Sequence, residues 1–148
     1  MNEIDLKQSL FLVMGSLSHE TRQYLDEQFR QFDLTRPEWL ILALLRAHKD
    51  GISQSYARSY VGVETSYLTK VLNRLEEKNF IVREIDLNNR RNRIIKINPK
   101  SLKTIKKIFA IIDSLNEEIQ RDLNEKQMRD LYKSLATIGK RLKIIKTG

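Results

Sequence analysis

Residues 53–97 constrain the fold of this chain more than any other segment, because helical and strand-like patterns follow one another there at short range. Over 64–78, apolar side chains recur at steps of three and four residues, which is the spacing of one buried helix face. These side chains are Leu68, Val71, Leu72 and Leu75. Ser53 is placed to cap a shorter helix that ends near Tyr60. Residues 61–63 (Val-Gly-Val) predict a tight turn between the two helices, since glycine supplies the backbone freedom that the turn needs.

A β-hairpin is expected after the second helix. Two strand-like runs, 80–85 and 93–97, are separated by the polar, asparagine-rich stretch 86–92. Asn79 lies where the helix needs a left-handed C-terminal residue, a place for which asparagine is the best choice after glycine. Helix, tight turn, helix and hairpin follow in the order of a winged helix-turn-helix. The predicted fold class is therefore mainly α with a small β-hairpin wing.

The exposed face of helix 64–78 suits double-stranded DNA. A helix fits the major groove and presents side chains to base edges, while its opposite face docks on the domain. The polar and basic residues on this face are Thr65, Ser66, Tyr67, Thr69, Lys70, Asn73 and Arg74. Those expected to face bases are Thr65, Ser66, Thr69 and Lys70. Those expected to hold phosphates are Ser53, Gln54 and Arg74.

Most of the net charge of +8 lies in residues 83–107, where nine basic and two acidic residues give +7. The hairpin carries Arg90, Arg91 and Arg93, and arginines on a narrow ribbon can enter a minor groove and gain from its negative potential. A concentrated positive patch favours nucleic acid first and an acidic membrane surface less. The charge by itself is also consistent with a solvent-exposed face that keeps the protein soluble. The order of the elements, the small polar helix face and the charge together favour DNA binding.

Residues 1–32 and 99–146 predict long helices with apolar stripes, the first beginning at Leu6. They flank a winged-helix lobe at 35–97 within a single domain, 1–148. Helices of this kind need something to pack on, and a homodimer would place two recognition helices about 34 Å apart, one turn of DNA. The alternative is that the stripes pack on the lobe of their own chain.

Several segments resemble the multiple antibiotic resistance regulator (MarR) family. They are Gly51-Ile52-Ser53-Gln54, Val61-Gly62-Val63, the run from Leu68 to Lys78, Phe80-Ile81-Val82-Arg83, and Asp86-x-x-Asn89-Arg90-Arg91. The flanking helices match too, so the resemblance extends over nearly the whole chain. It implies a homodimeric transcriptional regulator, usually a repressor, that binds a palindromic operator. Many relatives release DNA when a small ligand, often aromatic or anionic, binds between the dimer and DNA-binding lobes.

The chain departs from the family pattern at three places. Asn79 stands where the family usually has glycine, a conservative change for the backbone. Asn89 replaces the usual aspartate that orients the wing arginine two residues on, here Arg91. Asn89 can serve Arg91 only as a neutral acceptor, so we expect a less ordered wing. Residues 97–98 (Ile-Asn) replace a frequent Leu-Thr, and Asn98 can still cap the next helix.

Other site types find little support. The aromatic residues Tyr24, Phe29, Phe32 and Trp39 could line an effector pocket, or they could be plain core. His19 and His48 form no recognisable zinc set in a chain without cysteine. We expect no metal, no cofactor and no enzyme, since no nucleophile elbow or phosphate-cradling loop occurs. The lack of cysteine fits a reducing cytosol, and we expect a cytoplasmic protein.

The competing hypothesis is a winged-helix interaction module. Its basic wing would bind an acidic protein or RNA, and its long helices would mediate assembly. The face of helix 64–78 argues against this hypothesis, because a protein-docking helix is expected to expose more aromatic side chains. The expected partners are therefore a DNA operator, a second copy of the chain and a small-molecule effector, with no membrane.

Overall fold

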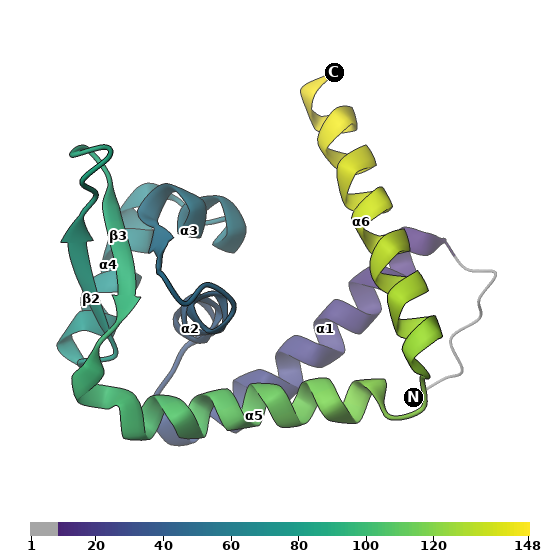
Figure 1. Ribbon diagram of the computed structural model, residues 1–148, viewed down its shortest axis with the longest axis horizontal. Coiled ribbons are helices and arrows are strands. Elements are labelled where there is room, and N and C mark those ends of the chain that lie inside the picture. Colours follow the sequence, from purple (N-terminus) through teal and green to yellow (C-terminus); the bar gives the residue numbers. More distant parts are fainter. Residues whose placement is uncertain (1–8) are drawn as a thin grey trace. The chain divides into compact units, whose positions relative to one another are not determined.

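The computed structural model describes residues 9–148, so Leu6, where the first apolar stripe was expected to start, lies outside the described residues. The chain divides into two compact units, and the boundary in the sequence lies between Phe109 and Ala110. Figure 1 labels the helices and strands of both units. Within the described part, no helix is long and apolar enough to cross a membrane.

Two long helices open the first unit. Helix α1 (Leu10–Phe29) leads through a short 3-10 turn, η1 (Arg30–Phe32), to α2 (Arg36–Ala47). A capping box opens α2. The Glu38 carboxylate accepts the backbone N–H of Thr35 at 2.9 Å, and the Thr35 side chain accepts a backbone N–H in return. Two of the amides that a helix start leaves unpaired are thereby satisfied.

The helix-turn-helix follows the predicted pattern closely. Helix α3 (Gln54–Val61) begins at Ser53, whose Oγ accepts the Tyr56 backbone N–H at 3.0 Å. Gly62 ends α3 in the left-handed region, with φ of 70°, and α4 (Thr65–Glu77) begins three residues later. The buried face of α4 consists of the four predicted side chains, Leu68, Val71, Leu72 and Leu75.

The described residues contain one antiparallel sheet of three strands in the order β1-β3-β2. Strands β2 (Ile81–Ile85) and β3 (Arg93–Ile97) form the predicted hairpin, and in Figure 1 their connecting loop projects past α3. Asn79 precedes β2 with φ of 59°, as expected for the end of α4. Strand β1 (Ile52–Ser53) was not predicted. It joins the edge of the sheet by pairing with β3.

The core of the first unit lies where α2, α4, the sheet and α5 (Leu102–Gln120) meet. Its fully buried large side chains include Phe29, Ile41, Leu42, Leu68, Leu72, Leu75, Ile81, Ile95, Ile105 and Ile108. Before α5, Asn98 caps the short helix η2 (Pro99–Ser101) by accepting the Lys100 backbone N–H at 3.0 Å, as predicted. Burial of the α4 stripe against this core fixes which face of α4 remains exposed.

The second unit consists of α5 from Ala110 onward and α6 (Glu125–Thr147). A capping box opens α6, since Asn124 and Gln127 each accept the other's backbone N–H at 2.9 Å. All residues of α6 are described, and none of them is buried. Its exposed large apolar side chains are Leu131, Tyr132, Leu135, Leu142, Ile144 and Ile145.

Replacing Gly51 with alanine is expected to destabilise the first unit by about 2 kcal/mol. Gly51 has φ of 94°, and a Cβ there would lie 2.7 Å from the Ile95 carbonyl oxygen and 2.8 Å from Lys96 Cγ. The matched control is Gly62→Ala, where φ is 70° but no heavy atom lies within 4 Å of the added Cβ. We expect that control to cost about 1 kcal/mol. Urea denaturation measures both values, and equal losses would contradict a steric role for Gly51.

Candidate nucleic-acid interface

The face of α4 that points away from the core carries the predicted DNA-binding side chains. Exposed residues on it are Thr65, Ser66, Tyr67, Lys70, Asn73 and Arg74, whereas Thr69 is half-buried. The Thr69 hydroxyl donates to the Thr65 backbone carbonyl at 3.0 Å. Its oxygen can still accept a hydrogen bond, but its proton is engaged within the helix. Thr69 therefore offers an acceptor but no free donor on this face.

The C-terminal half of α4 is fixed by polar contacts to neighbouring elements. Arg83 on β2 donates from Nη2 to Asn73 Oδ1 at 2.6 Å and to Glu76 Oε2 at 2.6 Å. Arg74 Nε lies 3.2 Å from Glu38 Oε1 on α2. Asn73 and Arg74, both predicted to contact DNA, thus have partners within the protein. Arg83 was not among the predicted site residues.

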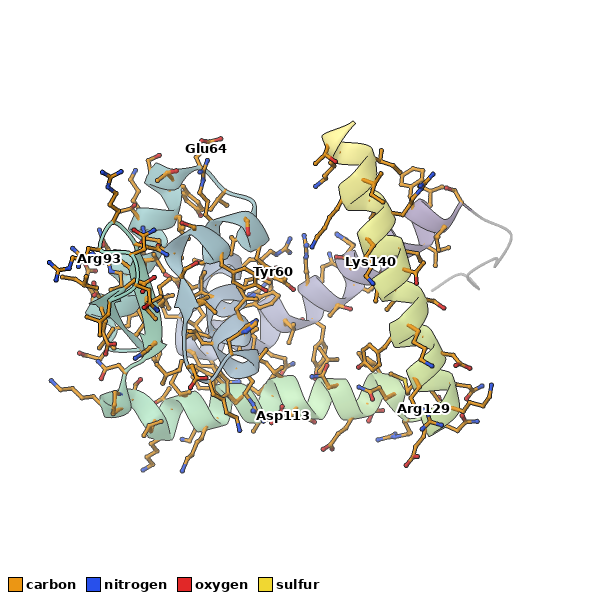
Figure 2. All side chains as sticks on the ribbon, turned by 45° about the horizontal axis from the view of Figure 1, so that its top comes forward. Tyr60, Glu64, Arg93, Asp113, Arg129 and Lys140 are labelled. Carbon is orange, nitrogen blue, oxygen red and sulfur yellow. The ribbon has the colours of Figure 1, made fainter. Side chains whose placement is uncertain are left out.

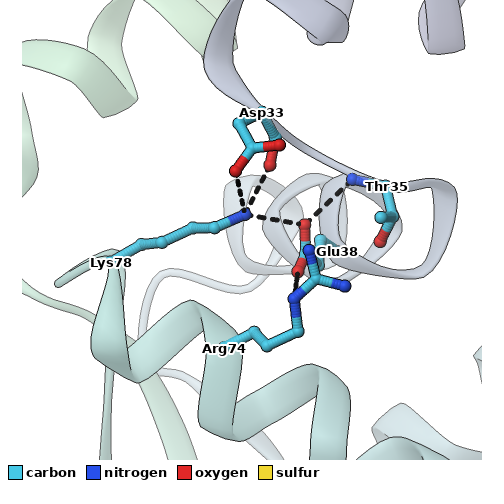
Figure 3. Close-up of polar contacts among 5 residues, drawn as sticks. All are labelled: Asp33, Thr35, Glu38, Arg74 and Lys78. Carbon is cyan, nitrogen blue, oxygen red and sulfur yellow. Dashed lines mark hydrogen bonds and ion pairs between the residues drawn. The ribbon is translucent and has the colours of Figure 1, made fainter.

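A buried carboxylate lies at the centre of the contacts between α2 and α4 (Figure 3). The Glu38 side chain is fully buried, accepts the Thr35 backbone N–H through Oε2, and lies 3.2 Å from Lys78 Nζ through the same oxygen. Lys78 also donates to the Asp33 backbone carbonyl. Arg74 completes the set as an ion pair with Oε1. Arg74 on α4 and Lys78, the residue that ends α4, thus share one buried anion on α2, which ties α4 to the core.

A cleft of about 270 Å³ lies between α3, the start of α4 and the hairpin. Its lining residues are Gln54, Ser55, Arg58, Thr65, Leu68, Arg91, Asn92 and Arg93. Gln54, Thr65, Arg91 and Arg93 were predicted to bind DNA, and the structure brings them together from three elements. Arg93 is labelled on the wing in Figure 2. Three guanidinium groups around one cleft make a strong site for an anion such as a phosphate.

Arg58 and Ser55 in this cleft were not predicted. The available signal was spacing, because Arg58 follows Gln54 by four residues and so lies on the same face of α3. The short helix contains only one buried residue, Ala57, and such a weak apolar pattern does not define an exposed face. Arg90, by contrast, was predicted with the other wing arginines but does not line the cleft.

The wing loop is held by its own hydrogen bonds. Asn89 Oδ1 accepts the backbone N–H of Arg91 at 3.2 Å, and Asp86 Oδ1 accepts the backbone N–H of Asn88 at 2.9 Å. The Asp86 N–H donates to the Asn92 carbonyl at 3.2 Å and closes the loop. The Asn89 contact is therefore with the main chain of Arg91 rather than with its guanidinium group, and hydrogen bonds close the loop, although the sequence predicted a less ordered wing.

The four aromatic residues proposed for an effector pocket do not line one cavity. Phe29 is fully buried, and its ring centroid lies 5.7 Å from that of Trp39 and 6.5 Å from that of Phe32. Phe29 and Trp39 are part of the core, and the half-buried Phe32 packs against Phe29 at its edge. Tyr24 is exposed and borders a separate polar cleft. Trp39 alone of the four lines a larger cavity of about 590 Å³ between α1, α2 and the end of α3.

An aspartate–arginine pair lies beside that cavity. Asp26 accepts hydrogen bonds from Arg36 and, at 2.8 Å, from Trp39 Nε1. Burial by itself raises the pKa of Asp26, but the hydrogen bonds from Arg36 and Trp39 and the arginine charge outweigh it. They hold the pKa of Asp26 below its usual value of 3.8. The pair fixes α1 to the start of α2. No group of three or more metal-ligating side chains occurs among residues 9–148.

Comparison with known proteins places the chain among winged-helix structures. A model of the MarR family matches residues 34–92. The S. aureus MepR–DNA complex is 22% identical with a TM-score of 0.72, and the match covers 92% of this chain and 99% of that one. The transcriptional regulator PA3341 is 26% identical with a TM-score of 0.81, covering 91% and 98%. MarR is 25% identical with a TM-score of 0.72, covering 95% and 97%. The predicted fold and the predicted family resemblance are confirmed.

Proposed function

We propose that this chain, whose residues 34–92 match a model of the MarR family, is a transcriptional regulator that binds double-stranded DNA. The observation that carries the proposal is the cleft in which Arg58, Arg91 and Arg93 meet the first turn of α4. A helix in the major groove has phosphates along both sides, and the cleft offers cations beside the helix. The similarity to a MepR–DNA complex supports the same proposal.

The regulator acts as a homodimer in this proposal. Residues 1–32 and 99–146 supply the dimer interface, and residues 35–97 form the DNA-binding lobe. Exposed apolar side chains on α1 and on α6 support this assignment, since such surfaces mark protein contacts. On α1 they are Leu10, Phe11, Leu12, Leu17 and Tyr24. Light scattering is expected to give twice the mass of the 17.5 kDa chain, and a monomer at micromolar concentration would exclude the dimer.

A two-fold dimer presents two copies of α4, and we infer a palindromic operator with half-sites about one DNA turn apart. We also infer that the regulator is a repressor whose DNA affinity responds to a small molecule. The cavity beside Trp39 supports a ligand because its volume of about 590 Å³ lies in the range of small-molecule sites. Its lining combines apolar side chains with Arg22 and Arg36, which suits an aromatic or anionic compound.

Fluorescence anisotropy with a mixed-sequence DNA duplex at two salt concentrations tests the proposal. We expect binding that weakens steeply with salt, because phosphate contacts release counterions. A matched RNA duplex and an acidic polypeptide are the controls. Binding to either control without binding to DNA would favour the interaction module over the regulator.

Lys70→Ala is expected to change base preference more than overall affinity. Lys70 is exposed on α4 and can donate to guanine O6 or N7, a contact worth about 1–3 kcal/mol of discrimination. Competition between DNA duplexes that differ at single positions measures the effect. Lys49→Ala is the matched control, since Lys49 is exposed and lies outside both the predicted DNA-binding residues and the proposed dimer interface, and it should leave base preference unchanged. Equal weakening by Lys70→Ala on every duplex would instead assign Lys70 to a phosphate.

A further inference from the structure

One apolar side chain on the wing is almost fully exposed to solvent. Leu87 in the loop between β2 and β3 has 90% of its surface exposed, the largest fraction among the described large apolar residues. Ile85, two residues earlier, is 53% exposed. Isolated apolar side chains on a surface are common, but exposure this complete at a loop tip leaves the side chain without packing inside the protein.

The loop holds Leu87 in this exposed position. The Asn89 backbone N–H donates to the Asp86 carbonyl at 3.2 Å, and the Asn92 backbone N–H donates to the Asn89 carbonyl at 2.8 Å. The Asp86 side chain also accepts the Asn88 backbone N–H. Asp86, just before the leucine, is thus bonded to Asn88 and Asn89, just after it, and the three contacts close the turn. An ordered turn has little freedom to fold its side chain back onto the sheet. The leucine is therefore available to a partner at little cost in ordering.

The surroundings of Leu87 indicate the chemistry of that partner. Arg90, Arg91 and Arg93 follow within six residues, and Arg91 and Arg93 line the cleft beside α4. A surface that receives both the leucine and the arginines must be anionic and also offer apolar contact. The DNA minor groove has both properties, because it has strong negative potential and admits inserted apolar side chains beside arginine. Its width of about 6 Å matches a narrow loop rather than a helix.

We propose that Leu87 enters the minor groove with Arg90, the wing arginine that does not line the cleft, and packs against the deoxyribose walls of the groove. The inference rests on the proposed DNA-binding function and adds an apolar contact to it. A contact with sugar is independent of sequence, and it releases no counterion. The leucine therefore contributes to affinity on every duplex, by an amount that does not vary with salt.

Anisotropy titrations of Leu87→Ala, Leu87→Asn and Leu87→Met at four salt concentrations test the proposal. The alanine and asparagine variants should bind every duplex about fivefold to tenfold more weakly for each wing. Plots of log affinity against log salt should stay parallel to those of the unmodified protein. The methionine variant keeps an apolar side chain of similar size and should bind as the unmodified protein does. Thermal unfolding should be unchanged in all three, since the side chain is exposed.

Three results would overturn the proposal. Unchanged affinity of Leu87→Ala would remove Leu87 from the interface while leaving DNA binding intact. A loss of equal size in Leu87→Met would show that the contact does not depend on apolar character. If the unmodified protein binds no duplex, Leu87 has no minor groove to contact. That last result contradicts the proposed function as well, whereas the first two leave it standing.

Discussion

Replacing Glu38 with alanine is expected to lower the free energy of unfolding of the first unit by about 3 kcal/mol. The substitution removes a fully buried carboxylate that caps α2 and pairs with Arg74 and Lys78 of α4. The Thr35 amide then loses its acceptor, and two cations lose their common partner. Because 49% of the Arg74 side chain is exposed, that cation recovers some hydration, and the cost stays below that of a fully buried pair. Chemical denaturation followed by circular dichroism measures the loss.

Glu38→Gln is the matched control. Its amide oxygen keeps the cap on Thr35 and its volume fills the same space, but it carries no charge. We expect it to cost about 1 kcal/mol. A difference of less than about 0.5 kcal/mol between the two variants, the usual scatter of surface substitutions, would show that the charge, which both variants lack, accounts for the whole loss and that the cap and the side-chain volume contribute little.

Removing the three guanidinium groups of the cleft should have the largest effect on DNA binding. In the variant Arg58→Ala, Arg91→Ala and Arg93→Ala, the slope of log affinity against log salt should flatten by about 0.9 for each lost phosphate contact. Affinity at low salt should fall about a hundredfold or more, on specific and non-specific duplexes alike. Anisotropy titrations over a series of salt concentrations give both quantities.

The control removes equal charge from the second unit. Arg121, Lys126 and Arg129 have side chains that are 69%, 80% and 64% exposed, and their ion pairs are on the surface. Pairs of this kind contribute little to stability. Their replacement by alanine changes the net charge by the same amount as the cleft variant. Because all three residues lie in the proposed dimer segment 99–146, light scattering must first show that the control variant keeps the mass of the unmodified protein. An identical flattening of the slope would mean that overall charge, rather than the cleft, determines affinity.

Sequence alone predicted the elements whose signals are local. Ser53 and Asn98 mark helix starts, because a cap is a contact between residues two or three apart. Gly62 marks a left-handed position because it has no Cβ, and Asn79 marks another because asparagine adopts that region more readily than most residues. The stripe of α4 and the two strands of the hairpin follow from periodicity over a few residues.

The unpredicted features depend on contacts between distant parts of the chain. Strand β1 exists only because Ile52 pairs with Ile95, and two residues show no alternation of their own. The role of Glu38 in fixing α4 depends on partners 36 and 40 residues away, which no local pattern joins. Sequence also could not tell whether Phe29 and Trp39 line a pocket or pack in the core. The same residue types make up cores and cavity walls, and in the structure the two rings pack against each other.

Selection of bound sequences from a random duplex library, followed by sequencing, tests the central claim most directly. A dimer whose two copies of α4 enter successive major grooves should enrich a palindrome with half-site centres about 10 base pairs apart. The cleft variant should lose affinity for the selected sequence. Salt-dependent binding of the library without enrichment of any sequence would contradict a regulator that recognises an operator.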